Sequence, residues 1–391
     1  MCYLPWLPSR LLGVIVQPNR MTNTEGAVPE LLPCRNIAAK LVMFLALTTV
    51  ASGLANAAVA VETVKIADGI YQFITAPDGY VPNGNCVAVI TQQDVLVYDT
   101  FTRPSTASVV LAEIRKLTNK PVRFIVNSHW HPDHWSGNEV FAQAFPGLEI
   151  IASEETRQFM LNIANAWPPL YAARLRKDQA DLEKEATSGR LPDGGPLTPE
   201  QRRSDEEDLK LEQEYVAEAA TVHRTYPTLT YSQALTLYHG GREFRFLEMV
   251  GDARGDTVLY LPKEKILVTG DLLSSPVPYY TPPLSEHAQS LRRLSQFDAD
   301  IIIPGHGPAR HDKSYLELEL NLLDSIIAQV RQAVQLGLVT VEDVQKAVNV
   351  DDLRAQFTHD DAKLNAKFHR YVNGMIENAY REARDGKKFE Y

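Results

Sequence analysis

The chain has 391 residues, of which 45% are hydrophobic, enough for one large folded domain or two smaller ones with a sizeable core. Its formal net charge of -10 provides no basic surface for nucleic acid or anionic lipid, so we expect a small-molecule substrate and no nucleic-acid partner.

The first part of the chain has the pattern of an export signal. A basic segment at 35–40 precedes an apolar run at 41–50, and the small-residue sequence Ala55-Asn56-Ala57 follows. We therefore expect residues 1–57 to form an N-terminal extension and signal peptide, with cleavage after Ala57 and a periplasmic or secreted protein. The apolar run is shorter than the roughly 20 residues of a membrane span, so no stable membrane anchor is expected.

The region from residue 62 to residue 312 combines strand and helix patterns. Short apolar runs predict strands, and apolar residues at helical spacing predict a helix at 106–117. The strands are expected at 70–74, 86–90, 95–98 and 122–126 in the first half, and at 234–238, 243–250, 257–261 and 265–270 in the second. Two strand-rich halves predict two facing sheets in a layered α/β domain.

Two further regions have a helical composition. Residues 154–225 are rich in charged residues and alanine, with glycine and proline in the middle, and this is typical of a helical insertion. After residue 312, helical spacing predicts helices at 315–336, 341–348 and 361–384. We therefore expect a C-terminal helical region at 313–391.

Three histidines and one aspartate fall within six positions directly after the strand at 122–126. They are His129, His131, Asp133 and His134. Histidine nitrogen and aspartate oxygen are good ligands for zinc and similar divalent ions. A polar loop whose histidines only form hydrogen bonds is the alternative. The chain has ten histidines in total, however, so three of them in six positions indicate a metal site.

Further carboxylates and histidines follow other predicted strands. Asp99 ends the strand at 95–98, Asp271 follows Gly270, and His306 lies in the sequence Pro-Gly-His-Gly at 304–307. With these motifs in this order, residues 62–312 resemble the metallo-β-lactamase superfamily of hydrolases. The resemblance implies an α/β fold, a four-layer αβ/βα sandwich, with two divalent metal ions, expected to be Zn²⁺, at one edge of the sheets.

The resemblance also implies a set of metal ligands. His129 and His131 would hold the first ion, Asp133, His134 and His306 would hold the second, and Asp271 would bridge both. Asp99 would lie behind the ligands and orient the histidine loop, since outer carboxylates fix the ring orientation of ligating histidines.

One position departs from the family pattern. The family usually places a histidine, the third ligand of the first metal, where the segment Gly251–Asp256 of this chain carries Asp252. Aspartate oxygen binds zinc at about the same distance as imidazole nitrogen, so we expect Asp252 to be a ligand. The added negative charge would make water on the first ion harder to deprotonate. A weak or empty first site, or another metal preference, remains the alternative.

These residues predict a hydrolase. A zinc-activated hydroxide, oriented by Asp133 as the catalytic residue, would attack an ester, lactone, thioester or amide-like bond of a small molecule. A β-lactamase, a mononuclear iron enzyme of this fold that oxidises sulfur compounds, and a non-catalytic metal-binding relative are the alternatives. The sequence identifies no substrate-binding residue and no oligomeric state.

Overall fold

The computed structural model describes residues 60–75, 83–163, 198–279 and 283–385, with short pieces between 180 and 196. The predicted signal peptide at 1–57 and its cleavage site lie outside the described residues.

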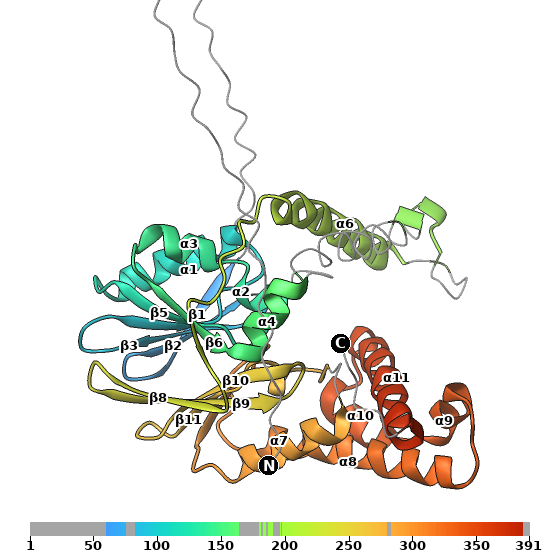
Figure 1. Ribbon diagram of the computed structural model, residues 1–391. Coiled ribbons are helices and arrows are strands. Elements are labelled where there is room, and N and C mark those ends of the chain that lie inside the picture. The colour runs from blue at the N-terminus through green and yellow to red at the C-terminus, as the bar shows by residue number, and fades with distance from the viewer. Residues whose placement is uncertain are drawn as a thin grey trace, which may run out of the picture. The chain divides into compact units, whose positions relative to one another are not determined.

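Two β-sheets face each other at the centre of the described part (Figure 1). The seven-stranded sheet has the order β1 (Val61–Ala67), β2 (Ile70–Thr75), β3 (Cys86–Ile90), β4 (Val95–Tyr98), β5 (Val122–Val126), β6 (Glu149–Ser153) and β7 (Leu229–Tyr231). The five-stranded sheet has the order β12 (Ile301–Ile303), β11 (Ile266–Val268), β10 (Arg254–Leu261), β9 (Arg242–Val250) and β8 (Ala234–His239). The two predicted strand series thus form one sheet each.

Helices cover the outer faces of both sheets (Figure 1). The first sheet is covered by α1 (Pro104–Leu117) and α3 (Asn138–Ala144), and the second by α7 (Leu284–Ser295) and α8 (Ser314–Gln335). The other helices are α2 (Pro132–Trp135), α4 (Glu154–Ile163), α6 (Pro199–Ala219), the 3-10 turn η1 (Gly270–Leu272), α9 (Val341–Ala347), α10 (Asp351–Thr358) and α11 (Ala362–Asp385). This order of layers confirms the expected αβ/βα sandwich.

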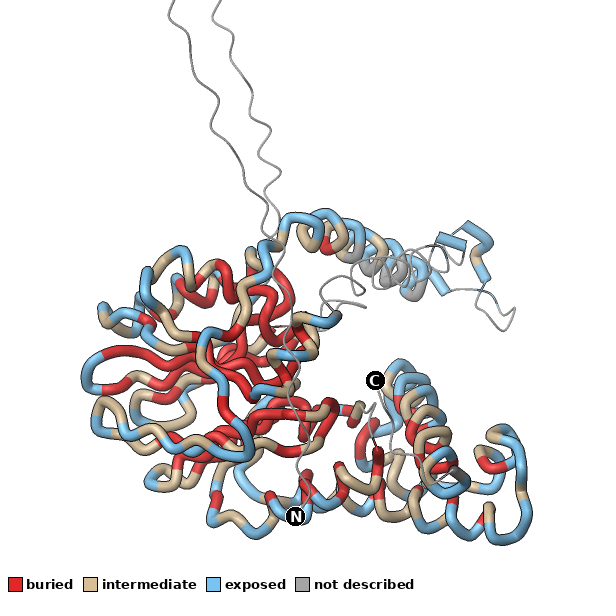
Figure 2. Tube along the Cα trace, in the orientation of Figure 1, coloured by how far each residue is buried: buried red, intermediate tan, exposed pale blue. Residues whose placement is uncertain are grey.

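Three hydrophobic clusters hold the layers together, and buried residues fill the centre of the two sheets (Figure 2). The cluster between the sheets includes Tyr231 from β7 and Phe244 and Phe246 from β9. The Tyr231 and Phe246 rings lie 6.3 Å apart between centroids, which joins the two sheets directly. Burial of these large side chains away from water is the main force that holds the sheets face to face.

The strand predicted at 265–270 is shorter in the structure. The strand β11 ends at Val268, because Gly270 adopts a left-handed conformation with φ of 55° and begins η1. An extended chain cannot continue through this conformation, which suits glycine. The change of direction turns Asp271 out of the sheet, toward the end of β5.

The insertion helix α6 packs against the first residues of α1 and forms hydrogen bonds with them. Its Tyr215 is buried, and the Arg103 guanidinium lies 5.4 Å from the centre of the Tyr215 ring. The Glu218 carboxylate accepts hydrogen bonds from the Ser105 backbone N–H at 2.6 Å and from its hydroxyl at 2.9 Å. An anion at this end of α1 is stabilised by the backbone N–H groups that the helix leaves free.

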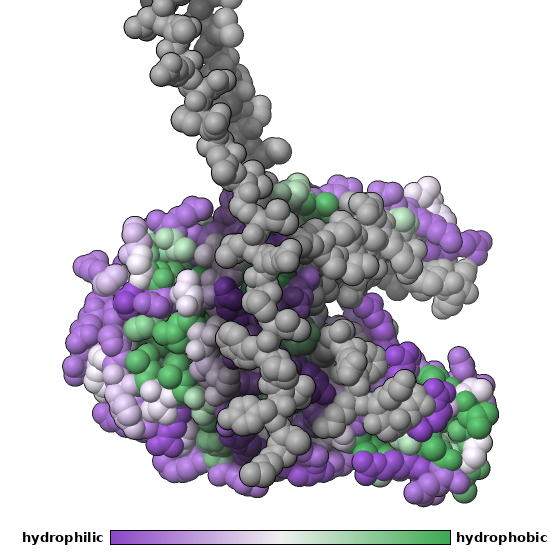
Figure 3. All heavy atoms as spheres, in the orientation of Figure 1, coloured by the Kyte–Doolittle hydropathy of each residue, from purple (hydrophilic) through white to green (hydrophobic). Residues whose placement is uncertain are grey.

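The C-terminal helices bear a hydrophobic surface around α9 (Figure 3). In the turn between α8 and α9, Leu336 and Val339 are 73% and 75% exposed. None of the helices within the described ranges has both the length and the apolar character needed to cross a membrane.

We expect Phe246→Ala to lower the free energy of unfolding by about 3–5 kcal/mol, because it removes a fully buried ring between the sheets. Urea denaturation followed by circular dichroism would measure the change. The matched control is Leu336→Ala, which removes an exposed side chain and should change stability little. Equal effects of the two substitutions would show that the inter-sheet cluster is not the main source of stability.

Candidate metal centre

The histidine loop leaves β5 and passes directly into the short helix α2. His131 has an extended backbone, and Pro132 occupies the first position of α2, where its fixed φ and missing N–H are tolerated. Asp133 and His134 therefore lie within one helical turn, while His129 and His131 precede it. The change from loop to helix lets four nearby residues point toward two neighbouring positions.

Asp99 supports this loop from behind. It follows β4 with a left-handed φ of 59° and is 1% exposed. One carboxylate oxygen accepts a hydrogen bond from the Ser128 backbone N–H at 2.7 Å, and the other lies 2.8 Å from Nδ1 of His134. The contact directs Nε2 of His134 toward the other candidate ligands, which is the orienting position expected for Asp99.

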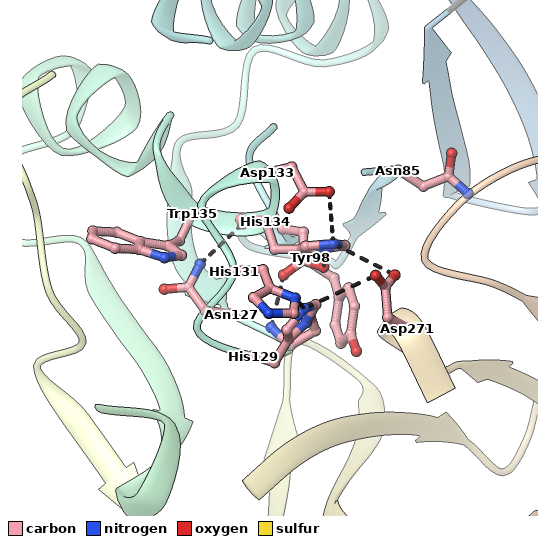
Figure 4. A network of polar contacts seen from close by, with 12 residues as sticks. Asn85, Tyr98, Asn127, His129, His131, Asp133, His134, Trp135 and Asp271 are labelled. Carbon is pink, nitrogen blue, oxygen red and sulfur yellow. Dashed lines mark hydrogen bonds and ion pairs between the residues drawn. The ribbon is translucent and has the colours of Figure 1, made fainter. Parts of the chain in front are cut away.

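The structure brings the seven predicted ligands into two overlapping groups. One contains His129, His131, Asp252 and Asp271, and the other contains Asp133, His134, Asp271 and His306. Within each group the candidate ligand atoms lie within 4.8 Å of one another. The two groups share Asp271, which lies beside His134 (Figure 4).

The second group has the spacing of a four-coordinate site. Nε2 of His306 lies 3.2 Å from Asp133 and 3.3 Å from Asp271. Nε2 of His134 lies 3.3 Å from Asp133 and 3.5 Å from Asp271. Tetrahedral zinc with its usual bond lengths places its ligand atoms about 3.4 Å apart. The residues of this group therefore fit a zinc-sized ion.

Two buried polar atoms of the second group make no hydrogen bond to any described residue. They are Nε2 of His134 and Oδ1 of Asp271. Leaving such atoms unsatisfied in the interior costs about 1–3 kcal/mol each. A cation bound between them would satisfy both atoms, which is a second observation in favour of a metal at this position.

The first group is more tightly closed. Oδ2 of Asp252 lies 2.6 Å from Nδ1 of His131 and 3.6 Å from Nε2 of His129. The two imidazoles approach to 2.9 Å between ring nitrogens, and His129 lies 4.0 Å from Asp271. The aspartate that replaces the family's histidine therefore reaches the loop despite its shorter side chain. An ion at this position requires His131 and Asp252 to separate slightly.

The candidate ligands shift one another's pKa values. Burial lowers the pKa of His129 well below its usual value, and the neighbouring His134 and His131 lower it further. Neutral imidazole is the form that binds metals. Burial alone would raise the pKa of Asp271, but His306 and His134 hold it well below its ordinary value. Conversely, Asp271 and Asp133 overcome burial and raise the pKa of His306 to about 9. Metal binding would therefore displace protons.

Two glycines allow the strand ends to meet at Asp271. A Cβ atom on Gly305 would lie 1.9 Å from Oδ1 of Asp271, so only glycine fits there. The Gly305 backbone N–H donates hydrogen bonds to the carbonyls of Gly270 at 2.8 Å and Leu273 at 3.0 Å. The close approach explains the glycines in both the Gly-Asp and the Pro-Gly-His-Gly segments.

Sequence reasoning missed two residues that support the ligand loops. Asn85 donates side-chain hydrogen bonds to the carbonyls of Pro304 at 2.8 Å and Gly307 at 2.6 Å, on both sides of His306. His287 of α7 is buried, and its Nε2 donates to the Leu272 carbonyl at 2.9 Å, directly after Asp271. Burial lowers the pKa of His287 to about 4, so its ring is neutral at neutral pH.

Comparisons with known proteins agree with these motifs. The family model described as "Metallo-beta-lactamase superfamily" matches residues 79–306. The Linear primary-alkylsulfatase of Pseudomonas sp. (strain ATCC 19151) is 26% identical over 278 residues, which cover 67% of this chain and 47% of that protein. The Probable metallo-hydrolase YqjP of Bacillus subtilis (strain 168) is 40% identical over 73 residues, 16% of this chain and 23% of that protein. The chain spans less than half the length of either relative.

A solved structure shows the same fold. The stereoselective inverting sec-alkylsulfatase Pisa1 from Pseudomonas sp. aligns with a TM-score of 0.54 at 16% identity, covering 83% of this chain and 50% of that one. The alignment extends beyond the residues matched by the family model, so it includes part of the helical regions.

We expect Gly305→Ala to weaken zinc binding at least about tenfold, since the added methyl group would displace the Asp271 carboxylate. Competition with a chromophoric chelator would measure the affinity. Gly374→Ala is the matched control, because no atom lies within 4 Å of the position of its new Cβ. Unchanged affinity in the Gly305 variant would contradict the assignment of Asp271 as a ligand.

Proposed function

Since this chain belongs to the metallo-β-lactamase superfamily, we propose that it is a metal-dependent hydrolase that cleaves an ester-type bond in a small molecule. The observation that carries the proposal is the position of Asp271 in both ligand groups, which lets one carboxylate serve two ions. Two divalent ions in such a site lower the pKa of water to near neutrality and stabilise the charge on the leaving group.

The ligand assignment belongs to this proposal. His129, His131 and Asp252 would hold the first ion, Asp133, His134 and His306 the second, and Asp271 both. Nitrogen and oxygen donors in four-atom groups favour zinc, and we propose Zn²⁺ for both positions. With Asp252 in place of the family's histidine, the first position gains an oxygen donor and is open to a wider range of divalent ions.

Asp133 is proposed to orient the attacking water. Its carboxylate lies between His134 and His306, at 3.3 and 3.2 Å, and is only 6% exposed. Although burial opposes ionisation, His134 and His306 hold the pKa of Asp133 below its ordinary value. The carboxylate is therefore ionised near neutral pH and can accept a hydrogen bond from water.

Alkyl sulfate esters are the substrate class that we favour within this proposal. The support is the similarity to the Linear primary-alkylsulfatase, which extends over 67% of this chain. Sulfate esters were not among the bonds expected from the sequence. The pattern at 35–57 supports a further proposal that the protein is exported to the periplasm or secreted.

Metal analysis tests the ligand assignment. We expect two zinc ions per chain after reconstitution, and about one in Asp252→Ala, because the first ion loses a ligand. Inductively coupled plasma mass spectrometry would count the ions. Two ions in the Asp252 variant would refute its role. One iron in the wild-type protein would favour the oxidative alternative, and no stoichiometric metal would favour a non-catalytic relative.

Hydrolysis assays test the activity. We expect the zinc-loaded protein to cleave at least one of an alkyl sulfate, a carboxylic ester, a lactone and a thioester, and to lose activity with a chelator. Asp133→Asn should lower kcat at least about 100-fold, because a neutral amide oxygen is a much weaker hydrogen-bond acceptor and base toward water than the carboxylate. Asp68→Asn, at an exposed carboxylate, is the control. Cleavage confined to a β-lactam would favour the β-lactamase alternative.

A further inference from the structure

The C-terminal helix α11 places two cations beside the loop that follows Asp271. In that loop, the Tyr279 ring meets the Tyr371 ring of α11 edge to face, with centroids 4.8 Å apart. Nζ of Lys367 lies 5.5 Å, and Cζ of Arg370 lies 5.8 Å, from the centre of the same Tyr371 ring. One aromatic contact therefore links both cations to the segment that carries Asp271.

The packing of α11 does not require these cations. The helix is held by a buried stripe that joins the hydrophobic cluster under the second sheet, namely Phe368, Val372, Met375, Ile376 and Ala379. Lys367 and Arg370 lie off this stripe and are exposed to solvent. Within the described part of the chain, neither cation forms an ion pair with a carboxylate. Two like charges three positions apart on a helix repel each other, so the arrangement lowers stability unless an anion is present.

The cations are also within electrostatic reach of the metal centre. Although the Lys367 side chain reaches solvent, partial burial of its ammonium lowers its pKa, the Arg370 charge lowers it further, and the Asp271 carboxylate raises it. This interaction agrees with the contact between Tyr279 and Tyr371, which places α11 against the loop that follows Asp271.

We propose that Lys367 and Arg370 bind the negatively charged group of the substrate and so select anionic esters, alkyl sulfates foremost, over neutral ones. The inference rests on the proposed hydrolase function and names its substrate class. Arg370 offers a planar fork that matches two sulfate oxygens, and Lys367 adds a point charge. Tyr279 and Tyr371 fix the pair relative to the ligand loop, so the two residues determine specificity without taking part in bond cleavage.

The test compares two esters of the same alcohol, octyl sulfate and octyl acetate, in the zinc-loaded full chain. Lys367→Gln and Arg370→Gln should each raise KM for the sulfate about tenfold or more, with kcat and zinc content unchanged. KM for the neutral acetate should not change. Lys367→Arg keeps the charge and should restore a low KM. Arg384→Gln removes a cation that lies 5.3 Å from the Tyr380 ring near the other end of α11, and is the charge-matched control.

Direct binding separates failure of this inference from failure of the proposed function. Calorimetric titration with inorganic sulfate should show binding to the wild-type protein and at least tenfold weaker binding to the double variant Lys367→Gln/Arg370→Gln. Equal KM increases for both esters, or equal sulfate affinities, would overturn the inference even in an active hydrolase. Absence of all hydrolysis, with sulfate binding lost in the double variant, would refute the proposed function and support the anion site.

Discussion

The site depends on one constraint: Asp271 must contact two groups of ligands, and each group combines residues from both sheets. The histidine loop follows β5 of the first sheet, whereas Asp271 and His306 follow β11 and β12 of the second. The left-handed turn at Gly270 and the missing side chain at Gly305 bring these loops into contact. The inter-sheet core then fixes the distance between them. The positions of the ligands therefore depend on the packing between the two sheets.

Much of the fold could be predicted because its signals are local. Apolar runs with clear ends predicted the strands at 86–90, 95–98 and 122–126 with the observed bounds. The helix α7 was not predicted, although Leu284, Ala288 and Leu291 have helical spacing and are buried. The segment before it is rich in proline, which indicates turns rather than the start of a helix. The strands β6 and β7 are short, and their places in the sheet depend on partners distant in the sequence.

The site was predictable only in part for the same reason. Motifs identified the candidate ligands, because each lies next to a strand end. The contacts that hold them depend on distant pairs, such as Asn85 with the His306 loop, 219 and 222 positions away. Lys367 and Tyr279 likewise lie near each other only because α11 packs against the loop that follows Asp271. Neither residue is part of a recognisable sequence motif. Sequence spacing identifies candidate ligands within one loop. The contacts between different loops are seen only in the three-dimensional structure.

Because the ligands come from both sheets, metal binding affects the stability of the whole folded chain. Every ion bound at this edge joins the first half of the chain to the second, and ligand binding stabilises the folded state by mass action. Without ions, three carboxylates, Asp133, Asp252 and Asp271, crowd together at the edge where the sheets meet. The abundance of the protein would then follow the supply of metal around it, since metal-poor conditions would leave more chains open to proteolysis.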